Sequence, residues 1–265
     1  MSRKDKRNNK KKLLIINIIQ LILIIILVYS AIHIFIWYKN NKTNKKIIEE
    51  ISQAIEINEN TEDEKYKVNF EELKNKNSDT VAWLKVENTN IEFPVVKAND
   101  NSYYLTHNFN KENNKAGWIF ADYKNKFDGT DKNIVIYGHN MRDDSMFGSL
   151  KDVIKEEWYN NEENKYITFV TENEYQTYQV FSIYQIEKED YYIQTNFQNN
   201  EFEEFIKTIK QRSKKDFNVD VTSKDNILTL STCANNNKYR VVLHAKKHIF
   251  RTIKSKTQKT HICTE

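Results

Sequence analysis

An uninterrupted apolar run dominates the N-terminal part of the chain. Residues 13–38 contain no Asp, Glu, Lys or Arg, and Ile and Leu predominate from Leu14 to Ile36. As a helix this run rises by about 39 Å, which exceeds the ~30 Å of a bilayer core. Trp37 and Tyr38 close the run, where amphipathic rings favour the membrane interface. The pattern predicts one transmembrane helix over residues 13–38.

Charge on either side of this run predicts its orientation. Residues 1–12 carry seven Lys or Arg against one Asp, whereas the lysines at 39, 42, 45 and 46 form a weaker positive flank. The positive-inside rule then leaves residues 1–12 in the cytoplasm and everything after Tyr38 outside the cell. A cleaved signal peptide is the alternative, but the run is longer than the usual 7–15-residue signal core and no small-residue cleavage motif follows it.

Helical periodicity follows the membrane segment. Between residues 40 and 64, apolar side chains recur at helical spacing, which predicts an amphipathic helix whose apolar stripe packs on the following domain. A second, short helix is predicted over residues 70–77. The stripe consists of Ile47, Ile48, Ile51, Ala54 and Ile55.

From Val81 onward the pattern changes to short strands separated by polar turns. Such a series predicts a mainly β domain, closed or nearly closed into an eight-stranded barrel. Pro94 lies inside one strand, so that strand is expected at an edge or a bulge. Helical breaks are predicted at residues 145–159 and in the late connection 200–214. The predicted strands are 81–86, 91–96, 117–121, 133–137, 165–171, 175–187, 226–232 and 239–246.

Composition fits one globular domain behind a membrane anchor. Of 265 residues, 29% are charged, and four Gly and one Pro are present. The net charge of +4 comes from residues 1–12, so the remainder does not predict nucleic-acid binding. The expected divisions are a basic tail (1–12), the anchor (13–38), a linker with N-terminal helices (39–80), the β domain (81–250) and a polar tail (251–265).

Two cysteines, Cys233 and Cys263, differ sharply in context. Cys233 directly follows the predicted strand 226–232, whereas Cys263 lies near the end of the polar tail. A disulfide between them is one alternative, yet proteins stabilised by disulfides usually have more of them. A buried, inert thiol is the other. We predict that Cys233 is a nucleophile and that Cys263 is incidental.

A histidine and an arginine complete the predicted site. Arg240 opens the strand after Cys233, and in a hairpin the two lie at the same end of the sheet. Its charge favours the thiolate and stabilises an oxyanion. His139 ends the strand 133–137 after Gly138, which gives the backbone room to turn, and would carry protons. His244 is the rival histidine, because alternation places it on the same face as Arg240. The alternative that Arg240 is a structural ion-pair partner stays open.

Metal and cofactor chemistry have little support in the sequence. No His or Cys pair has the spacing of a zinc site, and the acidic run at 187–190 lacks the pattern of a calcium loop. We predict no metal and no cofactor. Asp122 and Asn140 could orient His139, but the sequence does not place them.

These elements resemble the sortase family. Thr229-Leu230-Ser231-Thr232-Cys233 with Arg240 downstream, and Tyr137-Gly138-His139 upstream, are similar to its conserved site. Residues 83–96 and 100–105 resemble the class B branch in particular. The resemblance covers roughly residues 70–250 and implies a sortase-type barrel preceded by N-terminal helices.

The resemblance also implies the reaction. A membrane-anchored cysteine transpeptidase would cleave a C-terminal sorting motif of secreted proteins and pass the acyl group to an amine. That amine belongs to a peptidoglycan precursor or another acceptor. Cys233, His139 and Arg240 would be catalytic, and Ser231 and Thr232 would contact the substrate. The alternatives are a surface cysteine hydrolase that uses water, and a non-catalytic binding module in which Cys233 is dispensable.

Overall fold

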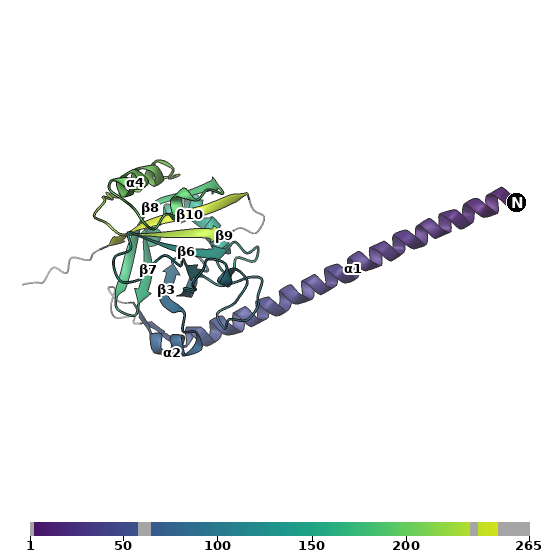
Figure 1. Ribbon diagram of the computed structural model, residues 1–265, viewed down its shortest axis with the longest axis horizontal. Helices are drawn as coiled ribbons and strands as arrows, with labels where there is room; N and C mark the ends of the chain where they lie inside the picture. The colour runs from purple at the N-terminus through teal and green to yellow at the C-terminus, as the bar shows by residue number, and fades with distance from the viewer. Residues whose placement is uncertain (1–2, 58–64, 234–237, 249–265) are drawn as a thin grey trace, which may run out of the picture.

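The computed structural model describes residues 3–57, 65–233 and 238–248. Its first element is one long helix, α1 (Arg3–Ser52), which extends away from the domain (Figure 1). Residues 12–52 of α1 are long and apolar enough to cross a membrane. The expected boundary between anchor and linker falls inside this helix, which continues to the domain without a break.

The helix predicted over residues 40–64 is only partly correct. α1 ends at Ser52, and β1 (Ile55–Ile57) pairs antiparallel with β2 (Tyr66–Val68). Ile55 leaves the helical stripe because it packs beside Tyr66 and Trp83 on the barrel exterior. The second predicted helix is confirmed as α2 (Phe70–Lys76), which Asn69 caps by accepting a hydrogen bond from the Glu72 amide.

Within the described residues, the remaining strands form a closed barrel in the order β10-β8-β7-β3-β4-β5-β6-β9. This confirms the eight-stranded barrel predicted from the sequence. The strands are β3 (Thr80–Val86), β4 (Glu92–Val96), β5 (Phe120–Ala121), β6 (Asn133–His139), β7 (Tyr166–Thr171), β8 (Tyr175–Glu187), β9 (Ile227–Cys233) and β10 (Tyr239–His248).

Most predicted strands differ from the structure by one to three residues at one end or both, and the differences in β5 and β6 bear on the site. β5 is shorter than predicted because Gly117 has a φ of +59° and the Trp118 amide donates to Tyr104 in a neighbouring loop. β6 is longer and runs through Gly138 to His139. A Cβ at Gly138 would lie 2.5 Å from Ile119 and 2.6 Å from Phe147. Gly138 therefore permits close packing and does not form a turn.

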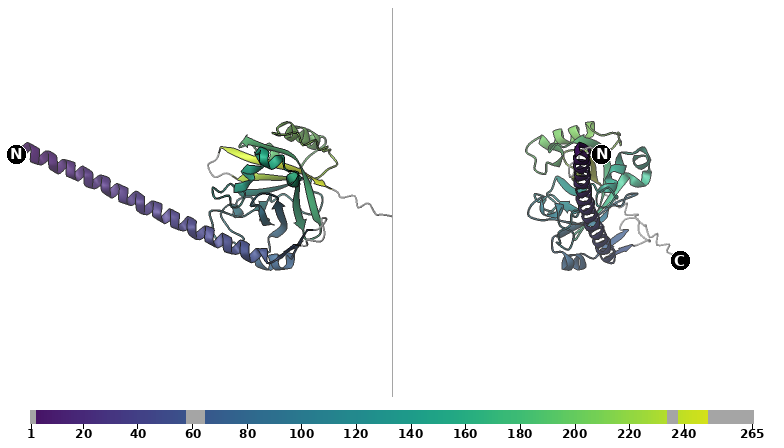
Figure 2. Two further views of the ribbon diagram at one scale, coloured as in Figure 1. Left: turned by 180° about the vertical axis from the view of Figure 1, so that it is seen from behind. Right: turned by 90° about the vertical axis from the view of Figure 1, so that its right-hand side faces the viewer.

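Helical segments cover the barrel between strands. η2 (Gly148–Ile154) and α3 (Glu156–Tyr159) occupy the first predicted helical break. α4 (Glu201–Gln211) occupies the second and lies over β8 and β10 (Figures 1 and 2). Its apolar stripe is buried as predicted, in a cluster separate from the main core. That stripe consists of Phe202, Phe205, Ile206 and Ile209.

The last turns of α1 are fixed to the domain. Ile47 and Ile51 are 4% and 3% exposed and belong to the main core cluster. Asn114 donates a 2.8 Å hydrogen bond to the Asn44 side chain, and Asn41 donates to Asp143. The C-terminal end of α1 is therefore packed and hydrogen-bonded to the domain.

Candidate active site

Two neighbouring parallel strands bring the predicted histidine and cysteine together. β6 pairs with β9 in a register that places His139 opposite Cys233 at the last position of both strands. Because the strands are parallel, their carboxyl ends lie at the same edge of the barrel. That edge lies on the side of the barrel from which α1 extends, in both views (Figures 1 and 2).

Arg240 enters this edge from the other neighbour of β9. β10 runs antiparallel to β9, with Val242 opposite Ser231, and this confirms the predicted hairpin. Arg240 of β10 and Cys233 of β9 each lie two residues beyond this pair, toward the same end of the hairpin. Arg240 is half-buried, and its Nη1 lies 3.4 Å from the Tyr239 carbonyl oxygen. The described backbone thus places all three predicted catalytic residues on consecutive strands.

The main chain holds the His139 ring. The side chain is 4% exposed, and its Nε2 lies 2.7 Å from the carbonyl oxygen of Leu105 in η1 (Tyr103–Leu105). A carbonyl oxygen can only accept, so Nε2 carries the hydrogen of this bond. Gly117 lies against the ring, since a Cβ there would approach His139 Cδ2 to 3.0 Å. Leu105 and Gly117 therefore form a seat for the imidazole.

Sequence reasoning missed this seat and named two other groups. Asp122 accepts hydrogen bonds from Tyr137 (2.8 Å) and Asn101 (2.8 Å), and Asn140 forms an isolated bridge with Met146. Every residue has a carbonyl, so nothing in the sequence marks Leu105. Gly117 did carry a signal, because glycine is the residue that readily adopts a positive φ.

The hydroxyls of Ser231 and Thr232 are tied into the barrel. Both residues are 1% exposed. The Ser231 hydroxyl lies 3.1 Å from the hydroxyl of Tyr192 in η4 (Tyr191–Ile193), and Thr232 Oγ1 accepts a 3.0 Å bond from the Val241 amide. Thr232 thus connects β9 to β10, and Ser231 connects β9 to the segment before α4. Substrate contact by either residue stays a prediction.

His244, the rival histidine, has a structural environment. It is fully buried, and its ring nitrogens lie 2.8 Å from the Tyr184 hydroxyl and 2.8 Å from Thr229 Oγ1. Burial lowers its pKa from 6.5 to about 3, so the ring is neutral near pH 7. A neutral, enclosed imidazole under α4 suits packing and does not suit proton exchange with a substrate.

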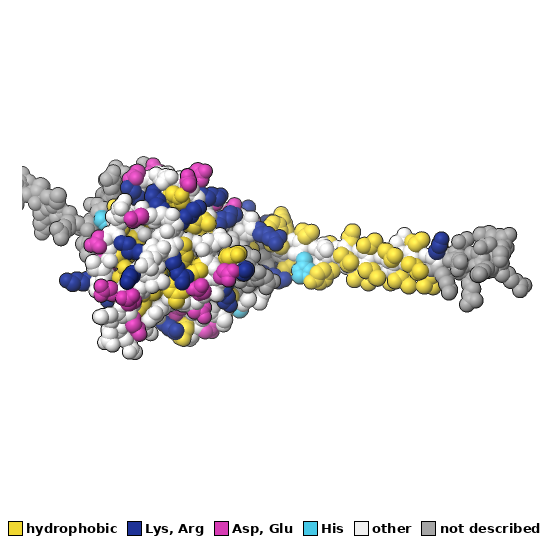
Figure 3. Space-filling view, turned by 90° about the horizontal axis from the view of Figure 1, so that it is seen from above, with side chains coloured by type: hydrophobic (Ala, Val, Ile, Leu, Met, Phe, Trp, Pro, Cys, Tyr) yellow, Lys and Arg dark blue, Asp and Glu magenta, His cyan; other side chains and the backbone are white. Residues whose placement is uncertain are grey.

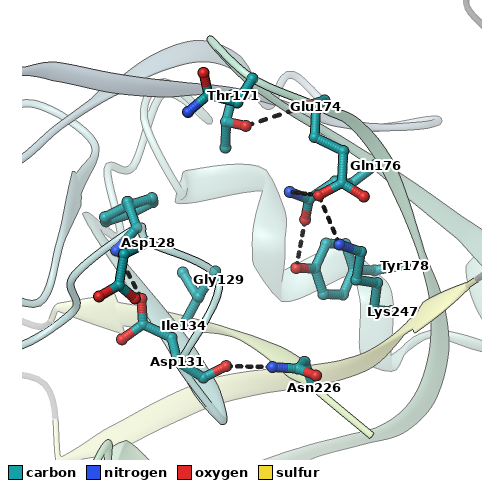
Figure 4. A pocket seen from close by; sticks show the side chains of 12 residues that line it. Asp128, Gly129, Asp131, Ile134, Thr171, Glu174, Gln176, Tyr178, Asn226 and Lys247 are labelled. Carbon is teal, nitrogen blue, oxygen red and sulfur yellow. Dashed lines mark hydrogen bonds and ion pairs between the residues drawn. The ribbon is translucent and has the colours of Figure 1, made fainter.

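A polar hollow lies at the end of the barrel opposite this site, and Figure 4 shows the side chains that line it. Its volume is about 250 Å³, and it lies beside Asp131, Ile134 and Asn226, where β6 and β9 begin. Glu174 accepts a hydrogen bond from Gln176 (3.1 Å) and forms an ion pair with Lys247 (2.7 Å), so the charges of Glu174 and Lys247 neutralise each other. In the part of the chain that the structure describes, no three His, Cys, Asp or Glu side chains are placed to hold a metal ion.

Comparison with known proteins gives consistent results. A family model described as a sortase domain matches residues 84–248. The chain is 35% identical to sortase B of Listeria monocytogenes over 234 residues, which span 83% of this chain and 94% of that protein.

Solved structures agree with the sequence matches. A sortase B from B. anthracis in complex with AAEK1 superposes with a TM-score of 0.70 at 33% identity, over 79% of this chain and 98% of that one. A Staphylococcus aureus sortase B–substrate complex superposes with a TM-score of 0.65 at 34% identity, over 69% and 85% of the two chains.

Proposed function

Because the chain belongs to the sortase family, with sortase B proteins among its relatives, it is a cysteine transpeptidase that anchors surface proteins to the cell wall, and we propose that Cys233, His139 and Arg240 carry out its reaction. The observation that supports this assignment most directly is the pairing of β6 with β9, which sets His139 opposite Cys233. β10 supplies Arg240 from the other side of β9.

In the first half of the reaction the Cys233 thiolate attacks the scissile carbonyl carbon of the substrate. The carbon–nitrogen bond then breaks, a thioester forms, and the leaving amine takes a proton from His139. The Leu105 carbonyl engages Nε2 of His139. We therefore assign the proton transfer to Nδ1, while the Nε2–H bond keeps the ring oriented.

In the second half an acceptor amine attacks the thioester carbonyl. His139 removes the proton from this amine, a new amide bond forms, and the Cys233 thiolate is released. Arg240 donates hydrogen bonds to the oxyanion of both tetrahedral intermediates, and this interaction is stronger in the transition state than in the ground state. For this chain we propose a C-terminal sorting motif as substrate and an amine of a peptidoglycan precursor as acceptor.

Product analysis tests the reaction and its alternatives. The full chain is incubated with a panel of sorting-motif peptides, with and without candidate amines, and mass spectrometry identifies the products. Amide products that require an added amine support transpeptidation, whereas free acid in the presence of saturating amine would identify a hydrolase. Cys233→Ala should form no thioester, and Cys263→Ser is the matched control. Turnover by Cys233→Ala would overturn the assignment.

Arg240 has its own kinetic signature. Arg240→Ala should lower kcat by about 10²–10³-fold with a nearly constant KM, because the lost donor acts on the transition state. Arg240→Lys keeps the charge and loses the planar fork, so it should recover only part of the rate. The pH dependence of Cys233 alkylation in each variant separates this effect from a smaller thiolate fraction. Normal turnover in folded Arg240→Ala would make Arg240 structural.

A further inference from the structure

Two adjoining hollows lie where α1 meets the domain. The first has a volume of about 240 Å³ and is mostly apolar, with Ile36, Trp37, Ala116 and Met141 in its wall. The second, of about 780 Å³, is polar. It lies between one face of α1 and the loop 108–115. Ile36, Asn40 and Lys115 line both hollows, which are therefore direct neighbours.

The order of the hollows matches the order of layers at a membrane surface. The uncharged run of α1 ends at Tyr38, and Lys39 is the first charge after it. The apolar hollow lies at the end of this run, and the polar one lies beyond it. In the space-filling view, hydrophobic side chains cover α1 up to the domain, and Lys and Arg gather where the two meet (Figure 3).

Charge in the polar hollow favours an anion. Lys39, Lys46 and Lys115 line it, together with the acids Glu50 and Glu112. Glu50 lies 3.5 Å from Lys46, and Glu112 accepts a hydrogen bond from Asn108. Three lysines against two engaged carboxylates leave a net positive charge. Asparagine amides in the same wall supply further neutral donors.

We infer that this junction binds one membrane lipid whose headgroup carries a phosphate and a net negative charge. An acyl chain would lie along α1 and enter the apolar hollow, and the phosphate would lie among Lys39, Lys46 and Lys115. Only an amphiphile satisfies both hollows at once, because a free anion leaves the apolar one empty. The inference rests on α1 as the membrane anchor and is independent of the role of Cys233.

The junction is connected to the candidate active site. The Met141 amide donates a 3.1 Å hydrogen bond to the His139 carbonyl oxygen. Ala116 precedes Gly117, which lies against the His139 ring. A lipid in the junction therefore contacts both segments that flank the histidine, and its binding should support their position.

Native mass spectrometry of the full chain tests the site. The protein is released from nanodiscs of phosphatidylcholine containing 10% phosphatidylglycerol, the phosphate-bearing probe with a net charge. Lys46→Gln/Lys115→Gln should reduce the fraction that retains one phosphatidylglycerol by about tenfold or more, since each juxtamembrane lysine contributes roughly a factor of five. Lys42→Gln/Lys45→Gln removes the same charge from two lysines of α1 that line neither of the two hollows, and this variant should retain the lipid.

A second variant and a second ligand complete the test. Met141→Trp fills the apolar hollow and should also lower retention, with thermal unfolding confirming that each variant is folded. If the two lysine double variants lose phosphatidylglycerol equally, diffuse surface charge explains the retention and the proposed site is wrong. Inorganic phosphate is also offered to the chain in pure phosphatidylcholine nanodiscs. If the chain retains it, the ligand is a free anion and the lipid site is wrong as well. Peptide cleavage, measured in parallel, reports separately on the proposed catalytic residues.

Discussion

His139 is oriented by backbone atoms on two sides. The Leu105 carbonyl bonds its Nε2, and the absence of a side chain at Gly117 leaves room for the ring. Side-chain chemistry in the sequence was sufficient to predict His139, Cys233 and Arg240 as the catalytic set, which stays a proposal. It could not predict the seat, because a carbonyl has no residue-specific signal and its position depends on how a loop folds against β6.

Replacing Gly117 should therefore damage activity through the histidine. Gly117→Ala places a methyl group 2.3 Å from the Tyr104 carbonyl oxygen at a φ of +59°. We expect kcat to fall by about 10- to 100-fold, since small misplacements of a catalytic group are costly. Gly129→Ala is the matched control, with a φ of +87° and nothing within 4 Å of the added Cβ. Equal rates in the two variants, measured by peptide cleavage, would contradict the seat.

Burial of His244 makes the fold sensitive to acid. Its pKa is about 3 in the folded state and 6.5 ordinarily. As pH falls below 6.5 only the unfolded state takes up the proton, so the free energy of unfolding decreases until about pH 3. From pH 7 to pH 5 this amounts to about 2 kcal/mol.

Urea unfolding at the two pH values measures this effect. His244→Gln should show a difference between pH 7 and pH 5 that is smaller by that amount, whatever its absolute stability. His248→Gln controls for the substitution itself. An unchanged difference in His244→Gln would show that other groups cause the acid sensitivity.

At the level of elements, the periodicity of the sequence predicted whether a segment is a helix or a strand better than it predicted where that segment ends. The stripes of α1 and α4 and the alternation in β8 are visible in the sequence because burial enforces them. The end of α1 is different, since Ile48 and Ile55 both continue the helical spacing. Ile55 forms a strand because β2 offers it a partner 13 residues away. Such long-range pairing is not encoded in local periodicity.

The packed end of α1 predicts where the chain can be shortened. Residues 44–265 keep Asn44, Ile47 and Ile51, whereas residues 53–265 lose the burial of both isoleucines. We expect the free energy of unfolding to be about 3–6 kcal/mol lower in the shorter protein, at about 1.5–3 kcal/mol for each buried side chain. Urea denaturation compares them. Equal stabilities would mean that the stripe contributes no packing energy.

On the scale of the whole molecule, a closed barrel joins strands that are distant in sequence. β6 and β9 are separated by more than 80 residues and still meet as parallel neighbours. The number of strands could be predicted because each is short and bounded by polar turns. Their order around the barrel was not predicted, because it depends on pairing between distant segments and cannot be derived from the local pattern.

Topology is a further prediction at this scale. With residues 1–12 in the cytoplasm, protease added to intact protoplasts should digest the barrel while a cytoplasmic marker protein survives. Charge asymmetry across α1 is the physical reason. Protection of the barrel until the cells are lysed would show the opposite orientation.

The packed junction between α1 and the barrel also determines how the enzyme meets its substrates. Asn41 of α1 donates a hydrogen bond to Asp143, and Met141, just after His139, lines the hollow that Ile36 and Trp37 of α1 also line. With α1 as the proposed membrane anchor, this packing would hold the candidate catalytic edge at a constant height, and the edge would travel only sideways with the lipid around α1. Encounters become a planar search, whose frequency depends on the number of enzyme and substrate molecules per unit area of membrane. Substrates that are still tethered to the same bilayer are then favoured over those already released into the medium.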